Sequence, residues 1–330
     1  MTGSAFVTGG TGFVGLNLIE QLTRLGWRVT ALHRPSSDLR QIARFPVRLI
    51  AGDLLDSQSL ARAVPGGVDV VFHLAADTSM WSRHQDRQRR INVDGTRNVI
   101  EAALAAGARR LVHISTWNVY GLGQGEISEA LPQLGRDSWI SYDRTKFLAE
   151  EEVRRGIDRN LDALIVNPAH IIGRYDRHGW ARLIIAAHGR WLPGVPPGAG
   201  TFCHAEAVAQ ALIAAAERGR TGRNYLLSGC DASFVEVFGV IAEVTGQRVG
   251  LRPLPAFAFR LAARVAVARA ALTGREPEMT PEGVAIALAR ARVVSKRAEQ
   301  ELGYRPAPLR TMIEDCYRWL VAEGLIASAR

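Results

Sequence analysis

The chain has 330 residues, 47% of them hydrophobic, and a formal net charge of +9, which allows one large α/β domain with a smaller lobe. It contains no run of about 18 uncharged apolar residues, so no transmembrane helix is predicted. Its three cysteines lack metal-ligand spacing, and its scattered arginines form no nucleic-acid motif. Because a strand is predicted within a few residues of Met1, we expect no secretory signal peptide. We therefore expect a cytoplasmic protein without a metal or nucleic-acid partner.

The first predicted strand, residues 4–8, is followed by a glycine-rich turn and a helix over residues 16–25. Gly9, Gly12 and Gly15 have the spacing G-x-x-G-x-x-G. Glycine lets the backbone approach a dinucleotide diphosphate, and the helix N-terminus offers free N–H groups. Glycine runs also occur in ordinary tight turns, but the flanking strand and helix favour a cofactor site. The predicted contacts here are Gly9, Thr11, Gly12, Phe13, Val14 and Gly15.

The end of the second predicted strand, residues 27–33, bears on which dinucleotide is preferred. NAD-specific sites usually carry Asp or Glu there for the ribose 2′-hydroxyl. This chain has His33 and Arg34, with Arg40 a little later. A guanidinium suits a 2′-phosphate through charge-assisted hydrogen bonds, so we favour NADP over NAD. The alternatives for Arg34 are stacking on adenine and an ordinary place on the surface.

Strands are also predicted over residues 47–50 and 68–74, the second continuously apolar as in a parallel sheet covered on both faces. Asp53, followed by Leu54, is placed to accept a hydrogen bond from the adenine amino group. Small residues after the fourth strand let the backbone approach the cofactor. The predicted contacts there are Leu74, Ala75 and Ala76.

A fifth predicted strand, residues 110–115, brings Thr116 to the carboxyl end of the sheet, where open α/β sheets place their active sites. Tyr142 and Lys146 lie four residues apart on a helix predicted over residues 141–155, so they share one face. An ammonium beside a phenol favours the phenolate form. It therefore lowers the pKa of the phenol toward the range needed for acid–base catalysis near pH 7. Thr116, Tyr142 and Lys146 are therefore the catalytic candidates, with Lys146 also placed to hold the nicotinamide ribose. A chance pair on a surface helix is disfavoured because lysine occurs only twice in the chain.

The other predicted elements complete the sheet and build a lobe. Asn92, near the start of a helix over residues 91–106, is a candidate cofactor contact, although a structural hydrogen-bonding role is favoured. Residues 161–166 and 224–227 are predicted strands. The helix over residues 254–272 carries Arg260 and Arg264 beside an apolar side; packing on the core is favoured over contact with a membrane surface. Further helices are predicted over residues 202–217, 234–246, 295–302 and 308–323.

Seven ordered motifs resemble the extended short-chain dehydrogenase/reductase family, that is, the NAD-dependent epimerase/dehydratase superfamily. They are TGGTGFVG (8–15), GDLLD (52–56), HLAA (73–76), NVDGTRN (92–98), HISTWNVYG (113–121), YDRTK (142–146) and VNPAHIIG (166–173). The resemblance implies an α/β fold with a doubly wound parallel Rossmann sheet in residues 1–175 and a smaller, mostly helical substrate lobe in residues 176–330, with some returns to the Rossmann sheet. It also implies a nicotinamide cofactor with Pro168 near its reactive ring, a catalytic set of Thr116, Tyr142 and Lys146, and a homodimer.

Within that family the pattern is most similar to the dihydroflavonol reductase and 3β-hydroxysteroid dehydrogenase-like branch. Trp117 and Asn118 stand where sugar dehydratases carry a carboxylate pair, and no RRPGD-like segment occurs late in the chain. The predicted reaction moves a hydride between NAD(P)(H) and a secondary alcohol/ketone, or an aldehyde, on a mostly apolar substrate. The alternatives are a nucleotide-sugar epimerase with tightly bound NAD and a cofactor-binding redox sensor. Five tryptophans are expected near the pocket or in lobe packing, namely Trp81, Trp117, Trp139, Trp180 and Trp191.

Overall fold

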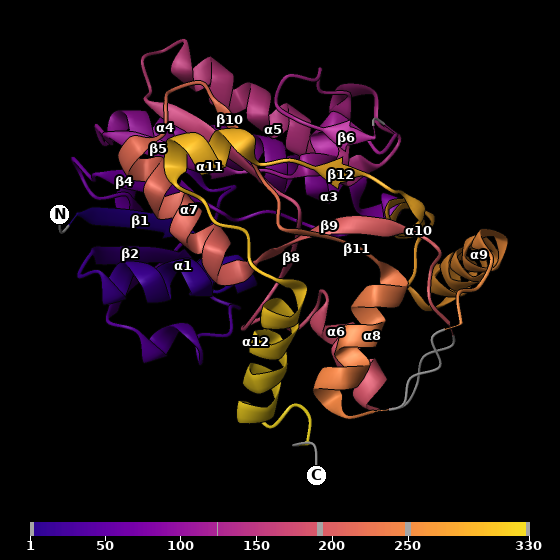
Figure 1. Cartoon of the computed structure of the whole chain (residues 1–330). Coiled ribbons are helices and arrows are strands. Elements are labelled where there is room, and N and C mark those ends of the chain that lie inside the picture. Colours follow the sequence, from indigo (N-terminus) through magenta and orange to yellow (C-terminus); the bar gives the residue numbers. More distant parts are fainter. Residues whose placement is uncertain (1–2, 124, 190–193, 248–251, 328–330) are drawn as a thin grey trace.

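A parallel sheet organises the computed structural model, which describes residues 3–123, 125–189, 194–247 and 252–327 (Figure 1). Within these residues the sheet has seven strands in the order β10-β7-β5-β4-β1-β2-β3. The strands are β1 (Ser4–Thr8), β2 (Arg28–His33), β3 (Val47–Ala51), β4 (Val70–His73), β5 (Arg110–Ile114), β7 (Ala163–Pro168) and β10 (Asn224–Leu227). Each strand corresponds to one predicted from the sequence, and the order confirms the predicted doubly wound α/β fold.

Helices cover both faces of this sheet, which explains why its strands are apolar on both sides. Phe6 of β1 packs in a core with α2, α4 and α5, whereas its neighbour Val7 packs in a second core with α1 and α7. These helices are α1 (Phe13–Arg24), α2 (Ser57–Ala63), α4 (Gly95–Ala105), α5 (Ser141–Ile157) and α7 (Ala205–Arg218). Since α7 and β10 follow residue 176, the second half of the chain returns to complete the Rossmann sheet.

Most of the remaining elements form the lobe beside the carboxyl ends of the strands (Figure 1). Its small sheets pair β8 (His170–Ile172) with β9 (Ala199–His204), β9 with β11 (Cys230–Ser233), and β6 (Glu126–Ile127) with β12 (Arg292–Val293). Its helices are α6 (Ala181–His188), α8 (Phe234–Thr245), α9 (Ala256–Thr273), α10 (Pro281–Leu288) and α12 (Leu309–Ala322), whereas α11 (Lys296–Leu302) packs on α7 and β10 of the main sheet (Figure 1). A separate apolar core holds α6, α8 and α12 together.

Two predicted helices begin elsewhere in the structure. The predicted helix over residues 202–217 is wrong at its start, because Phe202 and Cys203 belong to β9 and pair with β8 and β11. The predicted helix over residues 91–106 is α4 preceded by further helical turns. These are the π-helical turn Arg90–Asp94 and α3 (Gln85–Arg89). Short 3₁₀ turns occupy Ile42–Arg44, Ser82–His84, Trp117–Tyr120 and Gly135–Asp137.

Candidate active site

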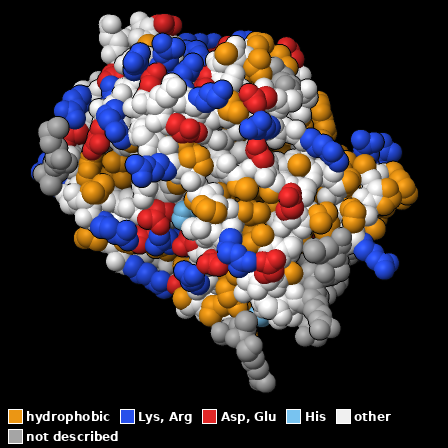
Figure 2. Space-filling model, viewed as in Figure 1, with side chains coloured by type: hydrophobic (Ala, Val, Ile, Leu, Met, Phe, Trp, Pro, Cys, Tyr) orange, Lys and Arg blue, Asp and Glu red, His pale blue; other side chains and the backbone are white. Residues whose placement is uncertain are grey.

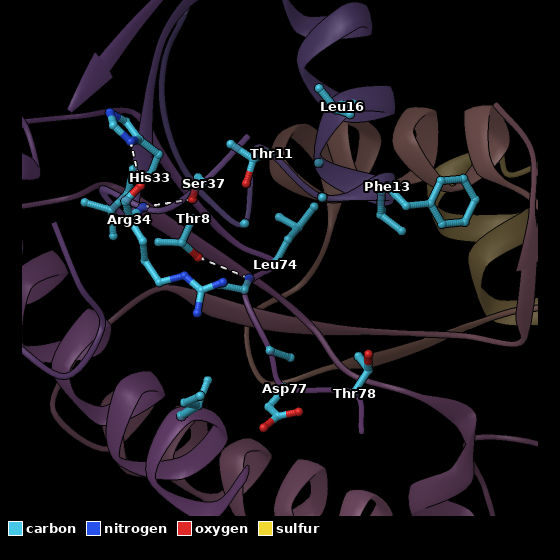
Figure 3. A pocket seen from close by; sticks show the side chains of 18 of the residues that line it. Thr8, Thr11, Phe13, Leu16, His33, Arg34, Ser37, Leu74, Asp77 and Thr78 are labelled. Carbon is cyan, nitrogen blue, oxygen red and sulfur yellow. Dashed lines mark hydrogen bonds between the residues drawn. The ribbon is translucent and has the colours of Figure 1, made fainter. Parts of the chain in front are cut away.

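A cavity of about 1160 Å³ lies at the carboxyl ends of β1, β2 and β4, where a doubly wound sheet binds its ligand (Figure 3). Twelve of the fifteen predicted cofactor contacts line it. They are Gly9, Thr11, Gly12, Phe13, Val14, Gly15, Arg34, Asp53, Leu54, Leu74, Ala75 and Ala76. The other three, Asn92, Lys146 and Pro168, are buried and are not in its wall.

The glycine turn is shaped so that backbone, not side chains, forms the cavity floor. Gly9 has φ +74°, and a Cβ there would lie 2.6 Å from the Ala75 nitrogen. A Cβ on Gly15 would lie 2.1 Å from the Gly9 carbonyl oxygen. Gly12 precedes α1 with no side-chain cap, so the first N–H groups of the helix face the cavity without a capping acceptor. These features fit the diphosphate of a dinucleotide.

Two arginines follow β2, and the structure separates their roles. Arg40 donates to both carboxylate oxygens of Asp38, at 3.0 and 2.6 Å, and this pairing holds the pKa of Asp38 well below its usual range. Arg34 lines the cavity, and in Figure 3 its side chain extends toward the middle of the hollow. Within the described residues no acidic partner of the Arg34 guanidinium is found. Asp53, which also lines the cavity, accepts a hydrogen bond from the Leu55 nitrogen at 2.9 Å.

The three catalytic candidates are brought together at the end of β5. Thr116 follows the strand, and Tyr142 lies in the first turn of α5, with Thr116 close enough to affect the pKa of its phenol. Burial raises the pKa of Tyr142, as does the neighbouring Asp143 carboxylate, whereas Thr116 acts to lower it. The phenol therefore keeps its proton at neutral pH in the free protein.

Lys146, one turn along α5, is buried behind this pair. Its Nζ donates to the Ile114 carbonyl oxygen at 2.7 Å and lies 3.4 Å from His113 Nε2. Burial lowers the pKa of Lys146 to about 8, partly opposed by Glu150. Burial and the adjacent ammonium keep His113 neutral by lowering its pKa, so its ring nitrogen accepts from Lys146.

A buried acidic residue on the same helix face holds Thr116 in place, and sequence reasoning missed it. Glu150 accepts hydrogen bonds from Asn167 at 2.6 Å and from Asn224 at 2.9 Å. Asn167 also donates to the Thr116 carbonyl oxygen at 3.0 Å. The spacing of four residues from Lys146 to Glu150 was the one available sequence signal.

A second missed support holds the turn after Thr116. Asn118 donates to Asp143 Oδ1 at 2.9 Å, and Ser138 donates to the other carboxylate oxygen at 3.2 Å. Burial raises the pKa of Asp143 to about 6, although these two hydrogen bonds act to lower it. The residue next to Tyr142 therefore fixes the segment that carries Thr116.

Asn92 has the structural role favoured from the sequence. Its side chain accepts from the Asp77 nitrogen at 2.7 Å and donates to the Asp77 carbonyl oxygen at 3.0 Å and to Thr145 at 3.1 Å. It thus joins the segment after β4 to the helix of Tyr142 and Lys146. Contact between Asn92 and the cofactor stays a prediction.

The tryptophans give little support to an aromatic substrate pocket. Trp81 and Trp117 are buried, Trp139 is 60% exposed, and Trp191 lies outside the described residues. Trp180 stacks on Phe234 in the lobe core, with ring centroids 5.6 Å apart. None of the four described tryptophans is in the wall of the cofactor cavity.

His170 sits among these aromatic rings, 5.8 Å from Trp117 and 5.5 Å from both Trp180 and Phe202 by ring centroid. Burial lowers the pKa of His170 to about 4. A histidine whose folded pKa lies below its unfolded value of about 6.5 takes up a proton on unfolding between these pH values. Its contribution to stability is therefore present above about pH 6.5 and is lost as the pH falls toward 4.

Replacing His170 with Phe should flatten the acid dependence of stability. Between pH 6 and pH 5, the free energy of unfolding measured by urea denaturation should fall by about 1.2 kcal/mol less in H170F than in the wild type. The ring cluster is kept, so only the titrating group is removed. His178, which is exposed, serves as the control when changed to Gln. An unchanged slope in H170F would contradict the assignment.

The far wall of the cavity comes from the loop after β8, which no sequence motif indicated. Tyr175, Asp176 and Gly179 line the cavity there. The loop is anchored by Arg174, whose guanidinium bonds to Glu20 at 3.1 Å and Glu206 at 2.5 Å. Within the described part of the chain no cluster of side chains suited to a metal ion and no helix able to cross a membrane is found.

Comparison with known proteins agrees with this site. Residues 5–228 match the NAD dependent epimerase/dehydratase family. The chain is similar to sterol demethylase protein B of Methylococcus capsulatus, with 32% identity over 98% of this chain and 100% of the relative. It is also similar to a putative dihydroflavonol 4-reductase of Synechocystis, with 29% identity over 97% and 95%.

Among solved structures, that of gox2253 has a TM-score of 0.84 and 31% identity, and covers 98% of this chain and 100% of its own. These matches confirm the resemblance inferred from the seven motifs, including the branch of the family. The chain belongs to the NAD dependent epimerase/dehydratase family, the extended short-chain dehydrogenases/reductases, and is an NAD(P)-dependent enzyme of that family.

Proposed function

We propose that this protein transfers a hydride between NADP(H) and a secondary alcohol/ketone, or an aldehyde, on a mostly apolar substrate. The observation that carries the proposal is the grouping of Thr116 at the end of β5 with Tyr142 and, one helical turn along α5, Lys146, whose Nζ donates to the Ile114 carbonyl oxygen of that strand at 2.7 Å. These three residues stand at the carboxyl end of β5, beside the cavity that fits a dinucleotide.

The protonation states favour reduction. The bound nicotinamide supplies or accepts the hydride. Tyr142, whose pKa is raised in the free protein, holds a proton to give to the substrate oxygen as it gains charge. Thr116 orients that oxygen through its hydroxyl. With its pKa lowered to about 8, Lys146 is still mostly an ammonium at pH 7, so its charge favours the phenolate left after transfer.

An apolar substrate is supported by two features. Trp117 and Asn118 follow Thr116, so the carboxylate pair of a sugar dehydratase is absent from that position. The two relatives are a sterol demethylase protein and a putative dihydroflavonol reductase, whose names indicate carbon-rich ring substrates. The proposal therefore extends to a ring or chain ketone with few polar groups.

The direct test is the oxidation of NADPH at 340 nm with a panel of sterol, flavonoid and long-chain ketones and aldehydes. Turnover of external NADPH with at least one apolar carbonyl supports the proposal. Purified protein that retains NAD through dialysis and consumes no external cofactor would instead favour the nucleotide-sugar epimerase, which takes a hydride and returns it.

Arg34 should set the preference for NADPH. Replacing Arg34 with Ser removes the charge-assisted bonds to a 2′-phosphate, each worth roughly 1.5–3 kcal/mol, so the Kd for NADPH should rise about 10- to 100-fold. The Kd for NADH, which lacks that phosphate, should change little. Isothermal titration calorimetry measures both. Arg48, exposed on β3 and outside the cavity wall, is the matched control as R48S. Equal weakening of both cofactors in R34S would assign Arg34 to adenine stacking.

A further inference from the structure

Helix α9 exposes an apolar stripe along its outer face. Phe257 is 68% exposed, Leu261 60%, Val265 52% and Leu272 89%. The first three are spaced by four residues and Leu272 follows seven later, so all four lie on one side of the helix. In Figure 2 hydrophobic and basic side chains gather at the right edge of the molecule, where Figure 1 places α9.

The stripe is not needed to hold α9 in the fold. The opposite face of the helix, through Phe259 and Ala263, packs on Val284 of α10 in a small core of its own. Leu254, Met279 and Leu288 complete that core. The inner face therefore secures the helix, and the outer apolar residues are left to water at a cost of about 25 cal/mol for each Å² exposed.

Arginines border the stripe on both sides. At 100° per residue, Arg260 and Arg264 lie along one edge and Arg269 along the other. All three are exposed, and α9 contains no Asp or Glu. This arrangement suits a lipid surface. The central apolar side chains can enter the lipid tails while the guanidinium groups at the rim stay among anionic headgroups.

We propose that α9 docks this protein on the surface of an anionic lipid bilayer. Charge complementarity selects this occupant, because a helix with three arginines and no acidic residue is attracted to a negative surface. The helix would lie along the surface, since no helix in the described residues is long and apolar enough to span a membrane.

Docking would place the bilayer close to the cofactor cavity. Glu276, just after α9, accepts a hydrogen bond from the Ser79 hydroxyl at 2.5 Å and lies 3.5 Å from His84 Nδ1. Ser79 directly follows Thr78, which lines the cavity. An apolar substrate could then pass from the membrane to the active site along this contact. That last step rests on the proposed function, whereas docking itself does not.

Vesicle flotation of the full-length protein tests the docking. Vesicles of phosphatidylcholine alone are compared with vesicles containing 30 mol% phosphatidylserine, first at low salt and then at 0.5 M NaCl. The wild-type protein should float with the anionic vesicles and lose most of this binding at high salt. R260E/R264E/R269E should bind at least on the order of 100-fold more weakly, because loss of each arginine charge alone weakens binding about fivefold and the new glutamates are also repelled. F257S/L261S should also bind at least tenfold more weakly.

The control R48E/R62E/R305E makes the same change in net charge at exposed arginines outside α9 and should float like the wild type. All variants should keep the wild-type melting temperature and affinity for NADPH, since every substituted side chain is exposed. Absence of wild-type flotation at low salt, or equal losses in the control, would overturn the proposal. So would a dimer by light scattering that F257S/L261S dissociates, because a second copy would then cover the stripe. If the α9 variants lose flotation but keep full NADPH affinity, the effect is on docking and not on the proposed reaction.

Discussion

Replacing Tyr142 with Phe should lower kcat by about 100- to 10,000-fold, the range typical for loss of a positioned proton donor. The substitution keeps the ring and removes only the phenol hydroxyl beside Thr116. The Kd for NADPH should stay near that of the wild type, because Tyr142 is not in the wall of the cofactor cavity. Steady-state rates at 340 nm and calorimetry on the same preparation give the two values.

Tyr304 supplies the matched control. Its hydroxyl is also buried and donates to the Ser228 carbonyl oxygen, far from α5 in the chain. Y304F therefore removes a buried phenol hydroxyl without touching the proposed site, and its kcat should be close to that of the wild type. Full activity of Y142F would refute Tyr142 as the proton donor. Wild-type protein that binds NADPH but turns over no carbonyl would favour the redox sensor.

The main sheet could be predicted from the sequence because each of its strands is a local apolar run. Residues 68–74, for example, are apolar enough to identify β4 without knowing its neighbours. The lobe strands are two to six residues long and exist through their partners. Phe202 and Cys203 show this: their local pattern continues into α7, but pairing with Cys230 and His170 makes them a strand. Pairing of that kind carries no local signal.

The candidate site likewise has local features that the sequence indicates and long-range contacts that it does not. The glycine turn, Thr116 and the Tyr142–Lys146 pair are contiguous or helically spaced motifs, so the sequence indicates them directly. The supporting contacts join distant segments, such as the bond from Asn167 to the Thr116 carbonyl oxygen across 51 positions. That bond becomes visible only when β7 lies beside β5. The same is true of the cavity wall formed by Tyr175 and its neighbours.

The glycine turn offers the second large effect, because Gly15 and Gly12 should fail in different ways when changed to Ala. A Cβ on Gly15 would lie 2.1 Å from the Gly9 carbonyl oxygen and 2.8 Å from the Gly10 Cα. Both are backbone atoms, so no side-chain rotation relieves the clash. Overpacking of this kind costs roughly 1–3 kcal/mol or more, and we expect G15A to lose at least about 2 kcal/mol in urea denaturation.

G12A should instead fold normally and lose its cofactor. Gly12 has φ −87°, which alanine adopts freely, and its Cβ would meet only the Gly9 oxygen at 3.2 Å. The added methyl group would stand at the α1 N-terminus, between the free N–H groups and a diphosphate. We expect the Kd for NADPH to rise at least about tenfold by calorimetry, with the free energy of unfolding within about 1 kcal/mol of the wild type.

Gly66 is the control for both variants, because a Cβ there meets nothing within 4 Å and the residue is outside the cavity wall. G66A should match the wild type in both stability and NADPH affinity. If G12A bound NADPH as tightly as the wild type, the diphosphate would have to lie elsewhere, and the glycine turn would be only a tight connection between β1 and α1. If G12A is stable but binds NADPH weakly, whereas G15A is unstable, the two glycines have separate roles in the same motif. Gly15 lets the turn close, and Gly12 leaves room for the ligand that the closed turn holds.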